Sequence, residues 1–416
     1  MGIIVQKFGG TSVADIDRIK RCAGFIKEEI ALGNRVVVVV SAMAGTTNQL
    51  INYVRQISPR IESREAKICY DMIVSSGENI ASGLLALALQ EAGVNATSWQ
   101  GWQVPIKTND CATRARILEI ETLKLKSALA QGQTPVVTGF QGVDNNGMIT
   151  TLGRGGSDTT ATALAAALKA ERCDIYTDVA GVFTADPKIV HKAQKLDMIS
   201  YEIMLELASQ GAKVMETRSV ETAFEHHVPL KVVSSFQPGS GTHIVKREKV
   251  MNQKPVYSIT SRVSDDLVFL RGFPKDPQKL FRLFEELSSK ELEIDMVQQH
   301  ESQSPNSVDV SFTLDKENKD KLVALLLQNR EEFGYKELDI NHDVAKISII
   351  GIGTKSHTDI LQQLLKTLSE KNMDLLSLSS SEITISILIR AEYTELAVRS
   401  LHHDYGLDKP GENYAA

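Results

Sequence analysis

Several short segments of this 416-residue chain combine glycines, hydroxyls and charged side chains in patterns that suit phosphate or carboxylate binding. The first is Lys7–Ser12 (KFGGTS), where a lysine stands just before two glycines. Glycines let the backbone approach a ligand closely, and a neighbouring lysine can meet a phosphate. A strand-to-helix turn with a surface lysine explains the same residues about as well, so this motif alone leaves both interpretations open.

A second segment, Thr150–Asp158 (TTLGRGGSD), leads directly into a predicted helix over 159–169. Ser157 or Asp158 can cap that helix, and free amide groups at its start favour an anion. Arg154 offers two parallel hydrogen bonds to a carboxylate or a phosphate. A glycine-rich turn with an N-cap explains the glycines and the serine but not the arginine, so we favour a functional loop.

Three weaker segments follow predicted strands or lie in a helical pattern. Tyr176–Phe183 (YTDVAGVF) and Thr184–Lys188 (TADPK) suit nucleotide binding at the carboxyl edge of a parallel sheet, although an ordinary loop explains them equally well taken alone. Ser41–Thr47 (SAMAGTT) follows another strand. Glu78, in Ser75–Glu78 (SSGE), could hold an ammonium group, although a solvated helix glutamate is commoner.

Other motifs do not support a site. Gly351–Ser356 (GIGTKS) lacks the glycine directly before lysine that the Walker A pattern requires, and we interpret it as a tight turn. The adjacent pairs His226–His227 and His402–His403 point apart on a helix, which disfavours a metal site. The 4 cysteines form no CxxC motif, so neither a zinc site nor a disulfide framework is indicated.

The elements that must position these residues form an alternating pattern over residues 1–245. Short β-branched runs predict strands over 3–6, 35–40, 136–138, 175–177 and 230–233. Helical patterns lie between them, over 15–31, 64–92, 114–130, 158–170 and 201–226. This alternation predicts an α/β layered domain with a mostly parallel sheet.

The second half of the chain has a different residue pattern. Turn residues at 238–241 and a charge run at 246–249 indicate a linker, which we place at 246–262. Residues 263–408 contain an internal repeat of roughly 80 residues, each copy reading β-α-β-β-α. That order is compatible with two small ferredoxin-like modules.

Composition excludes several classes of protein. Hydrophobic residues make up 42% and charged residues 24%, so disordered, collagenous and disulfide-scaffold classes are excluded. The formal charge of −6 gives no reason to expect nucleic acid or an anionic membrane as partner. The apolar runs are far shorter than the ~20 residues that a spanning helix needs, so we expect a cytoplasmic protein.

Taken together, the motifs resemble those of the aspartate kinases (aspartokinases) within the amino-acid kinase superfamily. The resemblance rests on KFGGTS, SAM, SGE, TLGRGGSD, TDVAGVF and TADPK and extends over almost the whole chain. It implies a three-layer αβα amino-acid-kinase domain at 1–245, the linker, two ACT modules at 263–342 and 343–408, and a tail at 409–416. The length is similar to that of monofunctional members.

The resemblance also implies a reaction and its residues. The family transfers the γ-phosphoryl group of Mg²⁺-bound ATP to the side-chain carboxylate of L-aspartate, which yields 4-phospho-L-aspartate for lysine, threonine and methionine synthesis. The implied catalytic residues are Lys7 and Asp158, and no protein metal site is implied. The implied substrate residues are Ser41, Thr47, Glu78, Arg154, Gly155, Gly156 and Ser157. The implied nucleotide residues are Lys7, Phe8, Gly9, Gly10, Thr177, Asp178, Phe183, Asp186, Pro187, Lys188, Lys213 and Val214.

The chain departs from the family pattern mainly in its tail. Lys188 stands where arginine is frequent, and Phe183 where tyrosine is frequent, and neither change should abolish activity. The effector-site candidates are Asp276, Gln278, Gln299 and Asp359, and the glycines usual in the effector loops are missing. We therefore expect weak or altered feedback by lysine and threonine.

The resemblance further implies assembly through paired ACT modules. A homo-oligomer is expected, and Met251 stands where some members start a small regulatory subunit, which would give an α2β2 assembly. An ordinary linker methionine is the simpler interpretation.

The sequence disfavours three other functions. Another acid kinase, such as glutamate 5-kinase, is disfavoured by Glu78, Arg154 and the ACT repeats. A catalytically silent ACT-based amino-acid sensor is disfavoured because Lys7 and Asp158 are present. A nicotinamide dehydrogenase would need Gly-x-Gly-x-x-Gly after the first strand, and the chain has no such motif there.

Overall fold

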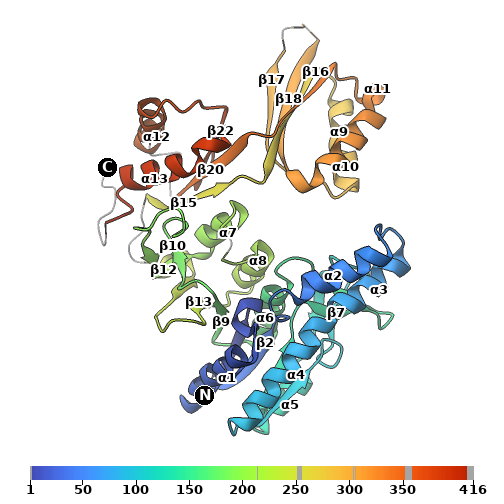
Figure 1. The fold of residues 1–416 in the computed structure, drawn as a ribbon, viewed down its shortest axis with the longest axis vertical. Coiled ribbons are helices and arrows are strands. Elements are labelled where there is room, and N and C mark those ends of the chain that lie inside the picture. The colour runs from blue at the N-terminus through green and yellow to red at the C-terminus, as the bar shows by residue number, and fades with distance from the viewer. Residues whose placement is uncertain are drawn as a thin grey trace. The chain divides into compact units, whose positions relative to one another are not determined.

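The computed structural model describes residues 2–212, 214–250, 255–302, 304, 306–351 and 358–409, which fall into two compact units (Figure 1). The first unit comprises Met1–Phe183 and Lys195–Gln253, and the second comprises Thr184–Gln194 and Lys254–Ala416. Lys213, Met251 and residues 352–356, which the sequence singles out, lie outside the described residues.

A mostly parallel sheet forms the centre of the first unit, with the strand order β12-β14-β13-β9-β1-β2-β6-β3. Its strands are β1 (Ile3–Phe8), β2 (Arg35–Val40), β3 (Ala96–Trp99), β6 (Thr134–Thr138), β9 (Arg172–Thr177), β12 (Met198–Ser200), β13 (Leu230–Ser234) and β14 (Thr242–Val245). All neighbouring pairs are parallel except β13 with β14. The five strands predicted from β-branched runs are therefore confirmed.

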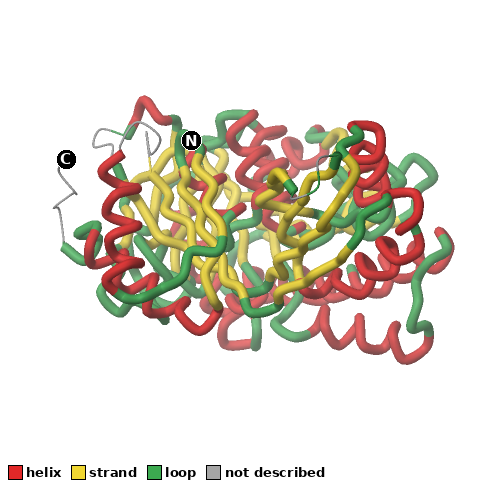
Figure 2. The backbone as a smooth tube through the Cα atoms, turned by 90° about the horizontal axis from the view of Figure 1, so that it is seen from above, coloured by secondary structure: helices red, strands yellow, loops and turns green. Residues whose placement is uncertain are grey.

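Helices cover both faces of this sheet (Figure 2). On one face, Val36, Val38 and Val40 pack with the apolar sides of α1 (Ile16–Ala31) and α4 (Ser76–Glu91). The alternate valines point to the other face, where α6 (Gly156–Leu168) packs on β1, β2 and β9. The predicted layered α/β fold is thus confirmed. Its other helices are η1 (Gly10–Val13), α2 (Thr46–Ile57), α3 (Arg64–Val74), α5 (Leu123–Ala130), α7 (Tyr201–Ser209), α8 (Thr217–Glu225) and η2 (Arg247–Lys249).

Some predicted helices are interrupted. The prediction over 114–130 was wrong in its first part, because Ile117–Ile120 form β5 and the helix begins at Leu123. The apolar residues of β5 continue the helical spacing of α5, which hides the boundary in the sequence. The stretch 201–226 is likewise divided into α7 and α8.

Two smaller sheets complete the first unit. One has the order β5-β4-β7-β8, with β4 (Ile106–Thr108), β7 (Gln141–Val143) and β8 (Ile149–Thr151). The other is the hairpin of β10 (Val182–Phe183) and β11 (Lys195–Leu196). Strand β8 leads directly into the glycine-rich loop before α6, so this small sheet sets where that loop begins.

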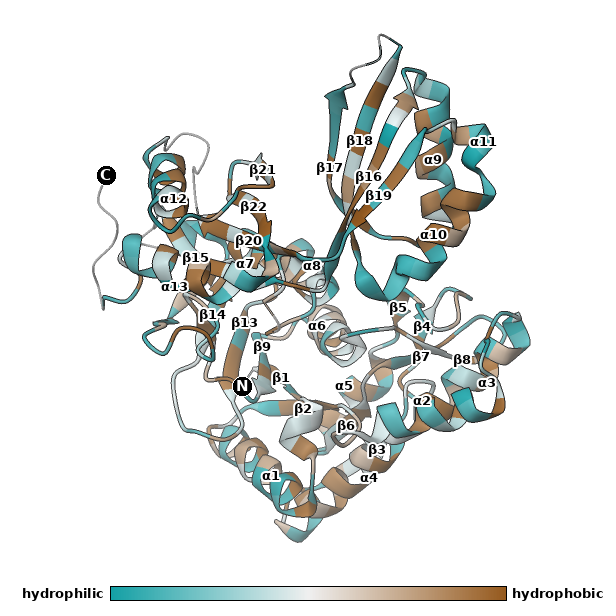
Figure 3. Ribbon diagram, turned by 45° about the horizontal axis from the view of Figure 1, so that its top comes forward, coloured by the Kyte–Doolittle hydropathy of each residue, from teal (hydrophilic) through white to brown (hydrophobic). Residues whose placement is uncertain are grey.

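The second unit contains two four-stranded antiparallel sheets, ordered β17-β18-β16-β19 and β15-β20-β22-β21. The first has β16 (Asp265–Pro274), β17 (Ile294–Glu301), β18 (Ser307–Asp315) and β19 (Glu337–Asn341), with α9 (Pro277–Ser289), η3 (Lys316–Asn318), α10 (Lys319–Gln328) and α11 (Arg330–Phe333). The second has β15 (Val256–Arg262), β20 (Val344–Gly351), β21 (Ser377–Ser380) and β22 (Thr384–Arg390), with α12 (Thr358–Glu370), η4 (Ala391–Tyr393) and α13 (Thr394–Asp404). The two predicted β-α-β-β-α repeats are confirmed. Figure 3 shows that the edge strand β17 is largely hydrophilic, as an exposed edge requires.

The assignment of 246–262 as a linker was wrong for its last seven residues. Val256–Arg262 form β15, which pairs antiparallel with β20 and covers its open edge. The whole first module is therefore inserted between two adjacent strands of the second. Only the long-range pairing with β20 gives this segment its strand role, which explains why a local composition shift at 246–249 obscured it.

One helical run, Arg64–Glu91, is long and apolar enough by length and composition to cross a membrane. In the structure it is divided into α3 and α4, and half of its most apolar window is buried. Leu85 and Leu89 of α4 belong to the core against the parallel sheet. This run therefore serves as a core helix in the first unit.

Candidate active site

Lys7 and Asp158 meet at the carboxyl edge of the parallel sheet. Lys7 is the penultimate residue of β1, and Asp158 lies in the first turn of α6. The Lys7 Nζ atom is 2.5 Å from Asp158 Oδ1, and each residue is 8% exposed. The first two sequence motifs are thus joined by a nearly buried ion pair, which fixes the lysine ammonium in a defined direction.

The loops that follow β1, β2 and β9 are held to one another through their backbones. Gly9 N donates to Tyr176 O over 3.1 Å, Ser41 N to Phe8 O over 3.0 Å, and Ala44 N to Gly10 O over 3.2 Å. A Cβ atom at Gly10 would lie 2.9 Å from the Ala42 carbonyl oxygen, so a side chain there would collide with the backbone. Three of the predicted motifs therefore form one edge of the first unit.

Glu78 is buried behind the loop after β2. Its Oε1 atom accepts a hydrogen bond of 3.0 Å from Ala42 N, and the residue is 3% exposed. Its Oε2 atom is buried without a hydrogen-bond partner among the described residues. Burial raises the pKa of Glu78 to about 7, against the opposing effect of the hydrogen bond from Ala42. This carboxylate is suited to accept a donor from a ligand.

The glycine-rich loop ends at the N-terminus of α6. Gly155 caps this helix with φ of 62°, a conformation that favours glycine, and a Cβ there would lie 2.2 Å from Glu216 Cβ. Ser157 is buried against Gly139, whereas Arg154 is exposed. The remaining predicted substrate residues are Ser41 and Thr47, both half-buried, and Gly156, which begins the helix.

The predicted nucleotide residues are divided between the two units. Phe8, Gly9 and Gly10 belong to the edge described above. In the same unit, the Thr177 hydroxyl donates to Asp178 Oδ1 over 3.2 Å, Phe183 ends β10, and Val214 is half-buried. Asp186, Pro187 and Lys188 are exposed in the second unit, where Lys188 N donates to Asp186 Oδ1 over 2.9 Å.

The predicted effector residues lie at three places in the second unit. Asp276 caps α9 by accepting a 2.9 Å hydrogen bond from Gln278 N. Gln299 is exposed on β17, and Asp359 lies in the first turn of α12. Next to Gln299, Gln298 Nε2 donates to Leu378 O over 3.0 Å, which joins the edge strands of the two modules.

Two polar contacts behind the edge were missed by the sequence analysis. The Ser12 hydroxyl donates to Ser235 Oγ over 2.8 Å and thereby connects the loops after β1 and β13. Asp71 of α3 is buried behind the glycine-rich loop. A single carboxylate within the apolar stretch 68–74 was the signal for Asp71, whereas no local pattern marks the serine pair.

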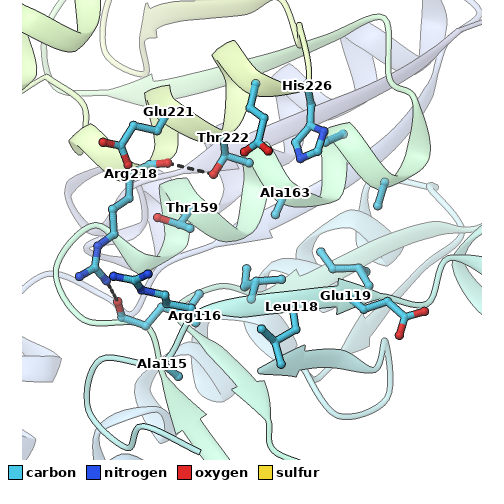
Figure 4. A pocket seen from close by; sticks show the side chains of 16 residues that line it. Ala115, Arg116, Leu118, Glu119, Thr159, Ala163, Arg218, Glu221, Thr222 and His226 are labelled. Atoms are coloured by element: carbon cyan, nitrogen blue, oxygen red, sulfur yellow. Dashed lines mark hydrogen bonds between the residues drawn. The ribbon is translucent and has the colours of Figure 1, made fainter. Parts of the chain in front are cut away.

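A cavity of about 500 Å³ lies elsewhere on the first unit, between α6, α8 and β5 (Figure 4). Arg116 and Arg218 lie at one end and His226 near the other. Leu152 of the glycine-rich loop lines it, but none of the residues assigned to substrate, nucleotide or effector does. The part of the chain that the structure describes contains no group of three or more acidic, histidine or cysteine side chains arranged to hold a metal ion.

The comparisons with known proteins identify the family of the chain. Residues 2–234 match the amino acid kinase family, and residues 347–405 match an ACT domain. The chain is 44% identical to aspartate kinase Ask_LysC of Stutzerimonas stutzeri over 100% of both chains, and 40% identical to aspartokinase 2 of Bacillus subtilis over 98% of this chain and 99% of that protein.

Solved structures give the same result. Aspartokinase III of E. coli in complex with aspartate and ADP matches with a TM-score of 0.81 at 27% identity, covering 97% of this chain and 99% of that one. The same enzyme in complex with lysine and aspartate matches with a TM-score of 0.73 at 28% identity, with the same coverage. With its amino-acid-kinase and ACT matches and its full-length relatives, this chain belongs to the aspartate kinases of the amino acid kinase family.

Proposed function

We propose that this protein transfers the γ-phosphoryl group of ATP to the side-chain carboxylate of L-aspartate and forms 4-phospho-L-aspartate. The observation that carries the proposal is the nearly buried Lys7–Asp158 pair beside two glycine-containing loops. Phosphoryl transfer to a carboxylate needs positioning and positive charge rather than a strong base. The names of the full-length relatives support aspartate as the acceptor.

On the phosphoryl side, Lys7 is the residue that neutralises charge on the transferring group. Asp158 orients the Lys7 ammonium, because their contact leaves the lysine few alternative directions. Phe8, Gly9 and Gly10 are the proposed nucleotide contacts of the same loop, in which Gly9 N already donates to Tyr176 O. Only glycine is accommodated at position 10 next to Ala42 O, so this loop packs closely against the loop after β2.

On the acceptor side, Glu78 receives the substrate ammonium through its unpartnered Oε2 atom. Arg154 binds a carboxylate of aspartate as a two-bond pair. The rest of this subsite is formed by Ser41, Thr47, Gly155, Gly156 and Ser157. Phosphate-like charge at the start of α6 is further stabilised by the amide groups of the helix N-terminus.

The nucleotide is assigned to the loops after β9 and β10. The proposed contacts are Thr177, Asp178, Phe183, Asp186, Pro187, Lys188, Lys213 and Val214. Mg²⁺ would be bound mainly through the phosphate oxygens of ATP, which is its usual mode at kinase sites. It would supply neutralising charge to those phosphates. Among the described residues no separate cluster of protein ligands competes for it.

Regulation and assembly complete the proposal. The ACT modules are the proposed place for weak binding of an amino-acid effector, lysine or threonine, and they pair between copies of the chain in a cytoplasmic homo-oligomer. An α2β2 assembly with a product started at Met251 would retain all four strands of the second module, since β15 follows that residue.

A coupled assay of ADP formation tests the reaction. ATP turnover is expected with L-aspartate, and hydroxylamine added to the product should trap an acyl hydroxamate. L-Glutamate serves as the matched acceptor with one more methylene. Turnover with glutamate and none with aspartate would contradict the proposal and favour a glutamate kinase.

A further inference from the structure

Asp71 is a fully buried carboxylate of the first unit that the proposed chemistry does not use. It lies in the last turn of α3 and is 0% exposed. Its Oδ2 atom accepts hydrogen bonds from Thr113 N over 2.8 Å and from Thr151 N over 3.0 Å. Its Oδ1 atom accepts from the Thr151 hydroxyl over 2.7 Å. One side chain therefore holds two segments that are distant in sequence.

Both segments border the glycine-rich loop. Thr151 is the last residue of β8, three positions before Arg154. Its carbonyl accepts a 2.9 Å hydrogen bond from Ala115 N, so the two segments also bind each other. A Cβ atom at Gly153 would lie 3.5 Å from Thr113 O, which places the Thr113 backbone against the loop itself.

The backbone at Thr113 adopts a strained conformation that neighbouring contacts must hold in place. Its φ of 73° is in the left-handed region, where a β-branched residue is a conformational outlier. Such a conformation persists only where the surroundings hold it in place. The hydrogen bond from Thr113 N to Asp71 is such a support.

Charge pairing does not explain why a carboxylate is buried here. The partners of Asp71 among the described residues are two amides and a hydroxyl, and none of them is a cation. Desolvation of an unpaired carboxylate is costly unless its oxygens are satisfied by hydrogen bonds. The hydrogen bonds to the loop are therefore the contribution that this residue makes.

We propose that Asp71 is a positioning residue that fixes the start of the glycine-rich loop and thereby sets the placement of Arg154 for the acceptor substrate. The inference rests on the proposed function, because it assigns that loop to aspartate binding. It concerns the acceptor side alone, since Lys7 contacts Asp158 in the first turn of α6, four residues after Arg154.

Substitution of Asp71 tests the proposal through a split between the two substrates. For Asp71→Ala we expect the KM for aspartate to rise by between about 10- and 100-fold, the range that a small misplacement of a binding group produces. The KM for ATP should be unchanged. Asp71→Asn should stay near wild type, because its oxygen can accept from both amides while its NH2 group donates to the Thr151 hydroxyl.

A second pair of variants keeps the test decisive if Asp71→Ala does not fold. Thr151→Val removes only the hydroxyl hydrogen bond and should raise the KM for aspartate less, in the same direction. Thr151→Ser keeps that hydroxyl and should restore the wild-type value.

The matched control is Asp144, at the opposite end of the same β7–β8 hairpin. It is 7% exposed and accepts 2.8 Å hydrogen bonds from Asn146 N and Met148 N. Asp144→Ala should lower the melting temperature without changing the KM for aspartate.

The outcomes separate this inference from the proposed function. If wild-type protein does not turn over aspartate, the proposed function fails. If wild type is active and Asp71→Ala or Thr151→Val resembles Asp144→Ala, with lower stability and an unchanged KM, the positioning role is wrong. The proposal would also be overturned if Asp71→Asn raised the KM for aspartate as much as Asp71→Ala does. The charge of Asp71 rather than its hydrogen-bond geometry would then determine aspartate binding.

Discussion

Lys7 places a cation at the carboxyl edge of the parallel sheet, where the nearly buried carboxylate of Asp158 holds it. Its ammonium is 2.5 Å from Asp158, so its orientation is set before any ligand arrives. Preorganised charge of this kind avoids reorganisation during the reaction, which is why it contributes more than a mobile surface lysine would.

Removing the Lys7 ammonium should therefore affect the chemical step. For Lys7→Ala we expect kcat to fall by a factor of about 10²–10³, as for other preorganised groups that stabilise transition-state charge. Steady-state kinetics with saturating ATP and aspartate measure this. Lys20, a surface lysine of α1, provides the matched control, and Lys20→Ala should keep wild-type turnover. A near-normal kcat for Lys7→Ala would contradict the assignment of Lys7 to the transferring phosphoryl group.

Arg154 should affect the acceptor rather than the nucleotide. A lysine keeps the charge but lacks the planar fork that binds a carboxylate through two parallel bonds. Arg154→Lys is therefore expected to raise the KM for aspartate far more than the KM for ATP. Initial rates with each substrate varied in turn decide this. A higher KM for ATP with an unchanged KM for aspartate would place Arg154 on the nucleotide side.

Glu78 should give aspartate binding a pH dependence near neutrality. Burial raises its pKa from 4.5 to about 7, so the folded protein keeps the proton as pH rises through that interval, and ionisation there costs stability. Because a substrate ammonium pairs with the ionised form, kcat/KM for aspartate should fall about tenfold per pH unit below pH 7. Glu78→Gln should lower kcat/KM and flatten this limb of the profile. If kcat/KM of Glu78→Gln still fell with the wild-type slope below pH 7, the titration would belong to another group.

At the scale of elements, the turn at 184–194 is built into the second unit by buried contacts. The Thr184 hydroxyl and His402 Nε2 of α13 share a hydrogen bond of 2.8 Å, and the same hydroxyl accepts from Gln194 N over 2.9 Å. Thr184 and His402 are almost fully buried. Arg399 Nε adds a hydrogen bond of 2.8 Å to Ile189 O.

Loss of the His402 ring should therefore destabilise the second unit. His402→Leu leaves a buried hydroxyl with one fewer partner, and we expect a loss of about 1–3 kcal/mol in the free energy of unfolding. Burial lowers the pKa of His402 below its usual 6.5, so the wild-type stabilisation is present above that pH and declines as the pH falls below it. Urea denaturation at several pH values measures both effects. His403→Ala, with a side chain that is 74% exposed, is the control, and an equal loss in both variants would contradict the argument.

The elements that could be predicted from sequence are those whose pattern is local. The five β-branched strands and the two repeats have enough residues to display their periodicity, and the glycine motifs mark the loops of the site. Strands β4, β7 and β8 have three residues each, too few to show alternation. The contacts of Asp71 and of Ser12 depend on segments far away in the chain, so no local pattern could reveal them.

At the scale of the whole molecule, the order of the sequence is not the order of the structural units. Residues 184–194 lie inside the kinase half of the sequence, yet Ala185 and Val190 pack in the core of the second unit with Ile259 and Leu401. Likewise the first ACT module lies in the sequence between β15 and β20, which are neighbouring strands of the other sheet. A boundary drawn from composition alone cannot represent such exchanges, because they are defined by packing.

The expected effector loop of the first module lies at the start of α9. A backbone amide of this loop already has a hydrogen-bond partner within the chain. Gln278 N donates to the Asp276 carboxylate over 2.9 Å. The resemblance predicts a glycine at position 278, so the glutamine side chain is expected to crowd an effector. In the second module, Asp359 would repel an effector carboxylate. An effector shifts a conformational equilibrium only through different affinities for the two states, so poor binding at these loops means weak feedback.

We therefore expect lysine and threonine to inhibit weakly when titrated against turnover at sub-saturating aspartate. Gln278→Gly restores the small residue and frees space beside the helix N-terminus, so it should strengthen inhibition by at least one of the two amino acids. Gln328→Ala, at the exposed C-terminal end of α10 and outside the effector-site candidates, removes a side chain without altering the start of α9 and serves as the comparison. Inhibition of the wild-type enzyme at low micromolar lysine or threonine would show that the effector loop closes despite Gln278. The same conclusion would follow if Gln278→Gly responded no more strongly than Gln328→Ala.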